Sequence, residues 1–227
     1  MTSLPELHFL GDSHLRAPRF AAEQGWFEPR KCHFTLVGGA TAIGLRHPKS
    51  KTQALAVYRE VLLPFRPNVI PVFQLGEVDC GFVIWVRAQR YAESVSEQLD
   101  QSLRAYVSFL RDIRDAGYGA LIVTPAVLPT IRDGQLDGEV SHLRREVQAS
   151  YRQRTDLTLA YNARLAEMCE AEKFTYVDFM PDLLDSETCL LDARFRHSDP
   201  ADHHLDPNIG GRLWVGRITE ALNRLVD

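Results

Sequence analysis

The chain has 227 residues, a formal net charge of -4 and a hydrophobic share of 45%, which fits one domain, residues 1–227, with a core of its own. The negative charge offers no basic surface to nucleic acid, and no apolar stretch approaches the roughly 20 residues that cross a bilayer. Because no N-terminal signal-peptide pattern is visible either, we expect a cytoplasmic protein that binds neither nucleic acid nor membrane. The sequence leaves the oligomeric state open.

Five short apolar segments predict buried strands, and each is followed within two residues by glycine or proline. They are, in chain order, Leu7–Leu10, Phe34–Val37, Asn68–Leu75, Ala120–Thr124 and Thr175–Phe179.

Stretches with helical spacing of apolar residues alternate with these strands. They are Gln53–Leu63, Val95–Ala116, Leu157–Glu172 and Ile209–Val226. Short apolar strands that alternate with helices predict a parallel sheet covered on both faces. We therefore expect an α/β fold, a flavodoxin-like three-layer α/β/α sandwich with a five-stranded parallel sheet. The polar segment Leu128–Ser150 carries two Asp-Gly turn signals and is predicted to be a long surface excursion.

Ser13 follows the first predicted strand directly after Gly11 and Asp12. Ligands bind beyond the carboxyl ends of the strands in an open parallel sheet, so this serine lies where chemistry is expected. Free backbone N–H groups at the start of the next helix can stabilise an oxyanion. The alternative is structural, since Asp12 or Ser13 can also serve as a simple helix cap.

The segment Gly11-Asp12-Ser13-His14 resembles the first sequence block of the GDSL-type, or SGNH, hydrolases. The resemblance implies that Ser13 is the nucleophile of a serine esterase and that its own N–H contributes to an oxyanion hole. The second block of that family supplies a glycine N–H after the second strand. Gly39, in the Gly38-Gly39 pair, matches it here, although a turn that needs glycine at positive φ explains the same residue.

The third block of the family reads Gly-x-Asn-Asp, and its asparagine is a further oxyanion donor. This chain has Gly76-Glu77-Val78-Asp79 instead, and Val78 has no side-chain donor. Losing one such donor typically costs about 100- to 1000-fold in rate, so either another group substitutes or the activity is low. Nearby candidates are Glu77, Arg87 and Arg90. The string from Gly76 to Cys80 is similar to that of a subset associated with polysaccharide and surface-glycan biosynthesis.

A hydroxyl nucleophile needs a base, usually a histidine oriented by a carboxylate, and both residue types occur in the segment from Ser198 to Asp206. This segment precedes the last helix, where the family places Asp-x-x-His, but neither histidine has that spacing. Two registers follow: His204 with Asp202, or His203 with Asp199. The Gly-Gly and Leu-Trp pairs that come next favour His204.

The same segment has two competing explanations. Its ligand-type residues can hold a metal, or it can be a solvated acidic loop; these residues are Asp199, Asp202, His203, His204 and Asp206. We expect no metal and no other cofactor, because ligand types on adjacent positions rarely all face one point. The four cysteines lack a CxxC pair and predict reduced thiols.

The resemblance therefore implies hydrolysis of an acyl ester, first of all an acetyl ester on a carbohydrate, by an acyl-enzyme mechanism. Predicted substrate contacts are Asp12, His14, Glu77 and Asp79, with His14 shaping the pocket or capping the helix rather than acting as the base. Lipid or thioester hydrolysis, and acyl transfer to a sugar, would use the same residues. From another class, a catalytically silent domain that binds a glycan or a partner protein fits Val78 and the irregular histidine segment.

Overall fold

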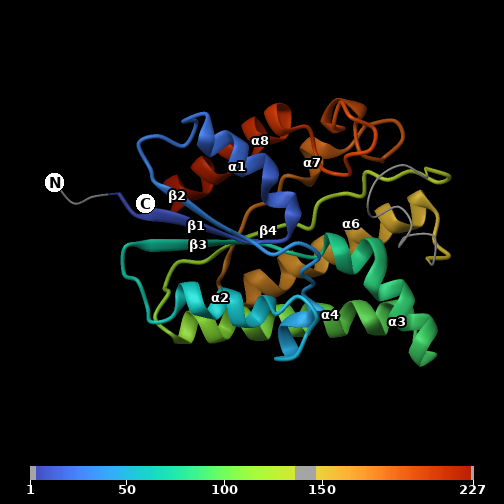
Figure 1. The fold of residues 1–227 in the computed structure, drawn as a ribbon, viewed down its shortest axis with the longest axis horizontal. Helices are drawn as coiled ribbons and strands as arrows, with labels where there is room; N and C mark the ends of the chain where they lie inside the picture. Colours follow the sequence, from blue (N-terminus) through green and yellow to red (C-terminus); the bar gives the residue numbers. More distant parts are fainter. Residues whose placement is uncertain (1–3, 136–146, 226–227) are drawn as a thin grey trace.

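The computed structural model describes residues 4–135 and 147–225. Its five strands form one parallel sheet in the order β2-β1-β3-β4-β5 (Figure 1). The strands are β1 (Glu6–Gly11), β2 (Cys32–Leu36), β3 (Val69–Gln74), β4 (Ile122–Thr124) and β5 (Thr175–Tyr176). Each overlaps one of the five predicted segments, so the predicted sheet and the α/β fold class are confirmed.

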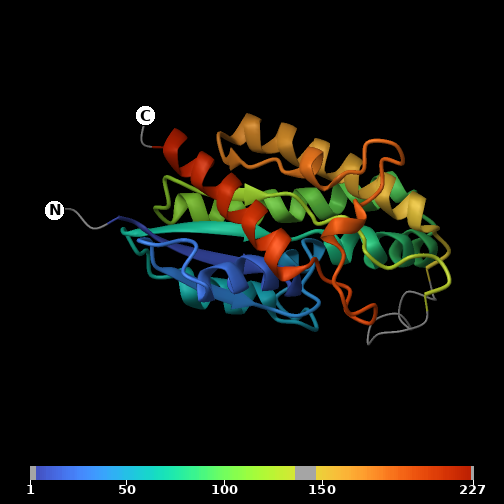
Figure 2. The ribbon, with the colours of Figure 1, turned by 90° about the horizontal axis from the view of Figure 1, so that it is seen from above.

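Helices cover both faces of the sheet, as Figures 1 and 2 show. One layer contains α1 (Arg16–Glu23), α7 (Met180–Leu183) and α8 (Pro207–Arg224). The other contains α2 (Ala54–Leu62), α3 (Ile84–Tyr91), α4 (Val95–Asp115) and α6 (Tyr151–Glu172). Four shorter turns join them: η1 (Ser13–Leu15), η2 (Ile43–Arg46), η3 (Asp79–Val83) and η4 (Ala193–Phe195).

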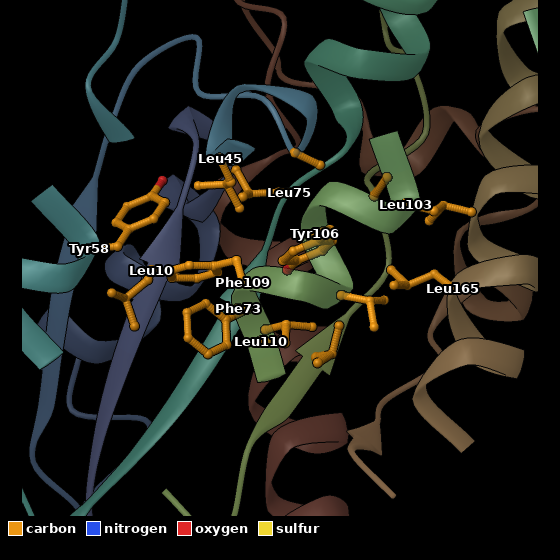
Figure 3. Packing of buried hydrophobic residues seen from close by; sticks show 14 of the residues in the cluster. Leu10, Leu45, Tyr58, Phe73, Leu75, Leu103, Tyr106, Phe109, Leu110 and Leu165 are labelled. Atoms are coloured by element: carbon orange, nitrogen blue, oxygen red, sulfur yellow. The ribbon is translucent and has the colours of Figure 1, made fainter. Parts of the chain in front are cut away.

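Alternating strand residues build one core on each face of the sheet. Leu10 and Phe73 pack with Tyr58 of α2 and Phe109 of α4, and the Phe73 and Phe109 rings meet edge to face with centroids 5.6 Å apart (Figure 3). On the other face Phe9 packs against Trp214 of α8. Burying each such side chain stabilises the fold by about 1.5 to 3 kcal/mol.

Three of the four predicted helices, corresponding to α2, α4 and α8, agree with the structure to within two residues at each end. Helix α6 begins earlier than Leu157, because Ser150 and Gln153 form a capping box at its start. The predictions above did not include α1 and α3, which are each only eight residues long. No helix in the part of the chain that the structure describes has the length and apolarity to cross a membrane.

The predicted surface excursion Leu128–Ser150 is corrected at its start. Leu128, Thr130 and Ile131 are buried, and the Thr130 hydroxyl donates to the His203 carbonyl at 2.6 Å. Residues 136–146 of that segment lie outside the described residues. The described start is therefore packed beneath the histidine segment rather than exposed on the surface.

Candidate active site

The loops that follow β1, β2 and β3 lie together at one edge of the sheet. Gly11, the last residue of β1, pairs with the last residues of both neighbours, Leu36 and Gln74. The backbone N–H of Val37 also donates to the Gly11 carbonyl at 2.9 Å. Ser13, Gly39 and Glu77, which follow these strand ends by two or three residues, therefore belong to one loop cluster.

Ser13 opens the short turn η1 and is half-buried. Asp12, and not Ser13, caps this turn: its carboxylate accepts a hydrogen bond from the His14 backbone N–H at 2.9 Å. Burial raises the pKa of the fully enclosed Asp12 carboxyl to about 7, against the opposing effect of His14 and with the added effect of Glu77. The cap thus fixes the turn and leaves the Ser13 side chain outside the capping interaction.

His204 and Asp202 form a close pair in the loop before α8. His204 Nδ1 lies 2.5 Å from Asp202 Oδ1, and the same carboxylate oxygen accepts from the His204 backbone N–H at 2.9 Å. The imidazole is buried, and among the residues that the structure describes its Nε2 has no hydrogen-bond partner. A histidine held by a carboxylate through Nδ1, with Nε2 left over, is the arrangement that a general base needs.

Arg16 of α1 bears on the tautomer of His204. Its Nη1 lies 3.2 Å from His204 Nδ1 and 3.6 Å from Asp202 Oδ2. Nδ1 cannot both donate to Asp202 and accept from Arg16. The shorter contact to an ionised carboxylate decides that Nδ1 carries the proton and that Arg16 pairs with Asp202. Nε2 is then the unprotonated nitrogen, as a base requires.

The electrostatic surroundings keep His204 uncharged and Asp202 ionised. Burial lowers the pKa of His204 to about 3, and electrostatic repulsion from His14, His203 and Arg16 acts in the same direction. For Asp202, partial burial is opposed by the hydrogen bonds from His204, which bring its pKa to about 2. At neutral pH His204 is therefore uncharged and able to accept a proton.

The structure does not pair the residues of the second register, His203 and Asp199. Asp199 is exposed and accepts from the Ala201 backbone N–H at 2.9 Å, while Asp206 caps α8 through the N–H groups of Asn208 and Ile209. The ligand atoms that Asp202, His203 and His204 offer lie within 4.8 Å of one another. Two of these groups, Asp202 and His204, are already joined by a hydrogen bond, which suits an acid–base pair.

Asp79 orders the loop that carries Gly39. Its fully buried carboxylate accepts from the backbone N–H groups of Ala42 and Ile43, at 2.7 and 3.0 Å, and from the Ser102 hydroxyl at 2.7 Å. Gly39 itself is exposed with φ of 69°, a conformation that favours glycine. Asp79 was predicted as a substrate contact, but protein groups occupy its carboxylate, so it has a structural role.

Replacing Asp79 by alanine is expected to lower the free energy of unfolding by about 2 to 4 kcal/mol, because two buried backbone N–H groups lose their acceptor. Urea unfolding measures the loss. Ser102→Ala is the matched control, since it removes one hydrogen bond to the same carboxylate and leaves the two backbone contacts; we expect about 1 kcal/mol there. Equal effects of the two variants would contradict this role for Asp79.

His14 and Glu77 lie against each other below the serine turn. His14 Nε2 is 3.3 Å from Glu77 Oε2, and both side chains are buried. Val78, where the family has its asparagine donor, is half-buried. The other two proposed substitutes are on α3, where Arg87 donates to Gln98 of α4 at 2.6 Å and Arg90 is exposed. Of the three candidates, only Glu77 is in the loop cluster.

Two cavities adjoin the acid–base pair. One of about 330 Å³ lies between α1 and the start of α8 and is lined by Arg16, His204 and Asp202, among others. Another of about 230 Å³ lies beyond Asp202, and His197 lines both. Ser13 is not among the lining residues of either cavity, so the two cavities adjoin the site on the side of Asp202. The predictions above did not name Arg16, although its position three residues after Ser13 indicates the same side of the turn.

The architecture is similar to that of several solved structures. A GDSL-like lipase from Bacteroides thetaiotaomicron VPI-5482 matches with a TM-score of 0.62 at 17% identity, over 97% of this chain and 89% of that one. An acetyl xylan esterase matches with a TM-score of 0.57 at 12% identity, over 95% and 98%. A phospholipase A1 from Streptomyces albidoflavus NA297 matches with a TM-score of 0.50 at 13% identity, over 94% and 98%.

No protein-family model matches the chain, and no curated protein matches its sequence. At such low identities the structural likeness establishes the fold. The chain has the three-layer α/β/α fold found in GDSL-like hydrolases, as the resemblance of the Ser13 segment implied.

Proposed function

We propose that the chain is a serine hydrolase that cleaves acyl esters, with Ser13 as nucleophile, His204 as general base and Asp202 as the acid that orients it. The observation that carries the proposal is the buried His204–Asp202 pair, whose Nε2 is left unpartnered in the described part of the chain. It belongs to a fold in which a serine follows the first strand at the same edge of the sheet. This combination supports nucleophilic catalysis more than passive binding.

In the proposed reaction the Ser13 hydroxyl oxygen attacks the acyl carbonyl carbon while its proton passes to His204 Nε2. The N–H groups of Ser13 and Gly39 hold the oxyanion. The bond to the alcohol then breaks, and the departing oxygen takes the proton from His204. Water attacks the acyl-enzyme by the same route, which releases a carboxylic acid and restores the Ser13 hydroxyl.

For the substrate we propose an acetyl ester on a carbohydrate. The acetyl xylan esterase with this fold supports that class, as does the Gly76 to Cys80 string that resembles the glycan-biosynthesis subset. A single-domain organisation, a cytoplasmic location and the absence of nucleic-acid or membrane partners stay predictions from the sequence.

A serine-directed phosphonate and a product assay test the proposal. We expect the phosphonate to label Ser13, and the folded protein to release acetate from p-nitrophenyl acetate and from an acetylated sugar. Acetate transferred to an added acceptor sugar instead of water would identify a transferase that uses the same site. A folded chain that is neither labelled nor active would favour the silent binding domain.

The pH profile of hydrolysis is expected to lack the usual histidine limb. Because the pKa of His204 is lowered to about 3, the base stays unprotonated as the pH falls through the ordinary histidine range. We expect kcat/KM to stay nearly constant from about pH 8 to about pH 5 and to fall only on further acidification. Steady-state kinetics with p-nitrophenyl acetate measure this, with tryptophan fluorescence to verify that the chain stays folded. A limb near the unperturbed histidine pKa of about 6.5 would contradict it.

A further inference from the structure

A second histidine–carboxylate pair lies beside the first. His14 and Glu77 meet at 3.3 Å, and their side chains are only 2% and 4% exposed. A charged group that is buried without its partner is strongly unfavourable. Each member of this pair therefore constrains where the other can lie and which charge it carries.

The backbone around Glu77 leaves little freedom to this carboxylate. Gly76 has φ of 118°, and a Cβ added there would lie 2.8 Å from Tyr161 Cε1 and 2.9 Å from Ala126 Cβ. Two residues after Glu77, Asp79 is anchored to the segment after β2 by two hydrogen bonds from backbone N–H groups, and to α4 by a third from the Ser102 hydroxyl. Glu77 is thus held between two fixed points, which is what a group that positions another side chain needs.

The His14 ring also contacts the general base. Its centroid lies 5.0 Å from that of His204 and 5.8 Å from that of His203. His14 directly follows Ser13 in the chain, so the nucleophile turn and the base meet through this imidazole. The buried order of groups is Glu77, His14, His204 and Asp202.

We propose that Glu77 and His14 are positioning residues for the hydrolysis: Glu77 holds the His14 imidazole against His204 and so fixes the orientation and charge of the general base. This inference rests on the proposed esterase function and assigns His14 and Glu77 a role other than substrate binding. Neither residue takes a proton from Ser13 in this scheme. Both act through His204.

The groups around the two histidines set the sign of the effect. His204 is faced by Asp202 and His203 from its own loop, by Arg16 from α1 and by His14 from η1. His14 is faced by Glu77 after β3, by the buried Asp12 that precedes its own turn and by His203. After burial, electrostatic repulsion from His14 is the next largest influence that lowers the pKa of His204. Replacing His14 by a residue that cannot be charged therefore raises the pKa of His204.

The test is the pH dependence of kcat/KM in His14→Gln and Glu77→Gln. We expect the acid limb of His14→Gln to move up by about one pH unit, because a like charge 5.0 Å from the base has gone. Glu77→Gln moves it in the same direction by less. In both variants we expect kcat to fall several-fold with KM nearly unchanged, because the disturbed group is the base and not the substrate pocket.

Glu6→Gln is the matched control. Glu6 also pairs with a histidine, His33, at 2.8 Å, but at the opposite end of β1. In Glu6→Gln, the acid limb of kcat/KM and the value of kcat should equal those of the wild type. If the limbs of all three variants coincide with the wild-type limb, the proposal is overturned.

The double variant His14→Gln, Glu77→Gln keeps the test decisive even if a lone replacement unfolds the chain, since it leaves two neutral amides in place of the pair. We expect the acid limb of the double variant to lie above the wild-type limb, by about as much as in His14→Gln. Where His14→Gln also folds, adding Glu77→Gln to it should change neither the limb nor kcat further, because Glu77 acts through His14. A double variant with the wild-type limb would overturn the proposal. Additive losses would overturn the proposal.

A measurement that does not depend on enzymatic activity separates this inference from the proposed function. In protein labelled with ¹⁵N-histidine, the NMR titration midpoint of His204 should rise in His14→Gln and stay put in Glu6→Gln. If the His204 midpoint rises in His14→Gln but the wild-type protein has no esterase activity, the proposed function alone is rejected. Full esterase activity with an unmoved midpoint would reject the positioning role alone.

Discussion

Ser13→Ala is expected to lower kcat for acetyl ester hydrolysis by at least about 10⁴-fold while the chain keeps its fold. Without the hydroxyl no acyl-enzyme forms, and only binding and the backbone N–H groups of the oxyanion hole remain. The turn itself should survive, because its cap is the Asp12 carboxylate on the His14 N–H and not the Ser13 side chain.

Initial rates with p-nitrophenyl acetate and mass spectrometry of the phosphonate-treated protein measure the effect. Ser198→Ala is a suitable control, since Ser198 is exposed in the histidine segment and makes no hydrogen bond within the described chain. That variant should keep wild-type turnover and labelling. Turnover by Ser13→Ala that matches the control would remove Ser13 from the mechanism.

The sequence predicted the sheet well because each strand is a short apolar run that ends at a chain breaker. Those breakers also located the carboxyl edge, where Ser13 and Gly39 follow β1 and β2. The spacing of the histidine segment left two registers open. In the structure Asp202 contacts the His204 ring whereas Asp199 turns back to its own backbone, which favours the first register; the catalytic assignment itself stays a prediction.

Other features depend on tertiary contacts that no local pattern encodes. Asp79 was predicted to be a substrate contact, yet its partners come from the segment after β2 and from Ser102, both distant in the chain. The contact of Arg16 with His204 joins α1 to the loop before α8. Likewise, the buried start of the segment after β4 depends on Thr130 and its contact with the histidine segment.

Asp202→Asn is expected to lower kcat by about 10³- to 10⁴-fold with little change in KM, through the tautomer of His204. In the wild type the carboxylate requires a proton on Nδ1. An uncharged amide no longer enforces this, and Arg16 Nη1, already 3.2 Å from Nδ1, can donate to it. The proton then occupies Nε2, the nitrogen that accepts it from Ser13 in the proposed reaction. The wrong tautomer is therefore favoured by a contact that is already in place.

Two comparisons make this prediction specific to Asp202. Asp199→Asn keeps an acceptor for the Ala201 N–H and should change kcat by less than about two-fold. A large loss there with little loss in Asp202→Asn would instead support the His203 register.

Adding Arg16→Gln to Asp202→Asn removes the donor that stabilises the wrong tautomer, so part of the lost rate should return. Initial rates with p-nitrophenyl acetate measure all four variants, and no recovery in the double variant would contradict the role of Arg16. Because Arg16 is exposed and also pairs with Asp202, Arg16→Gln alone should reduce kcat only slightly, which separates its two contacts.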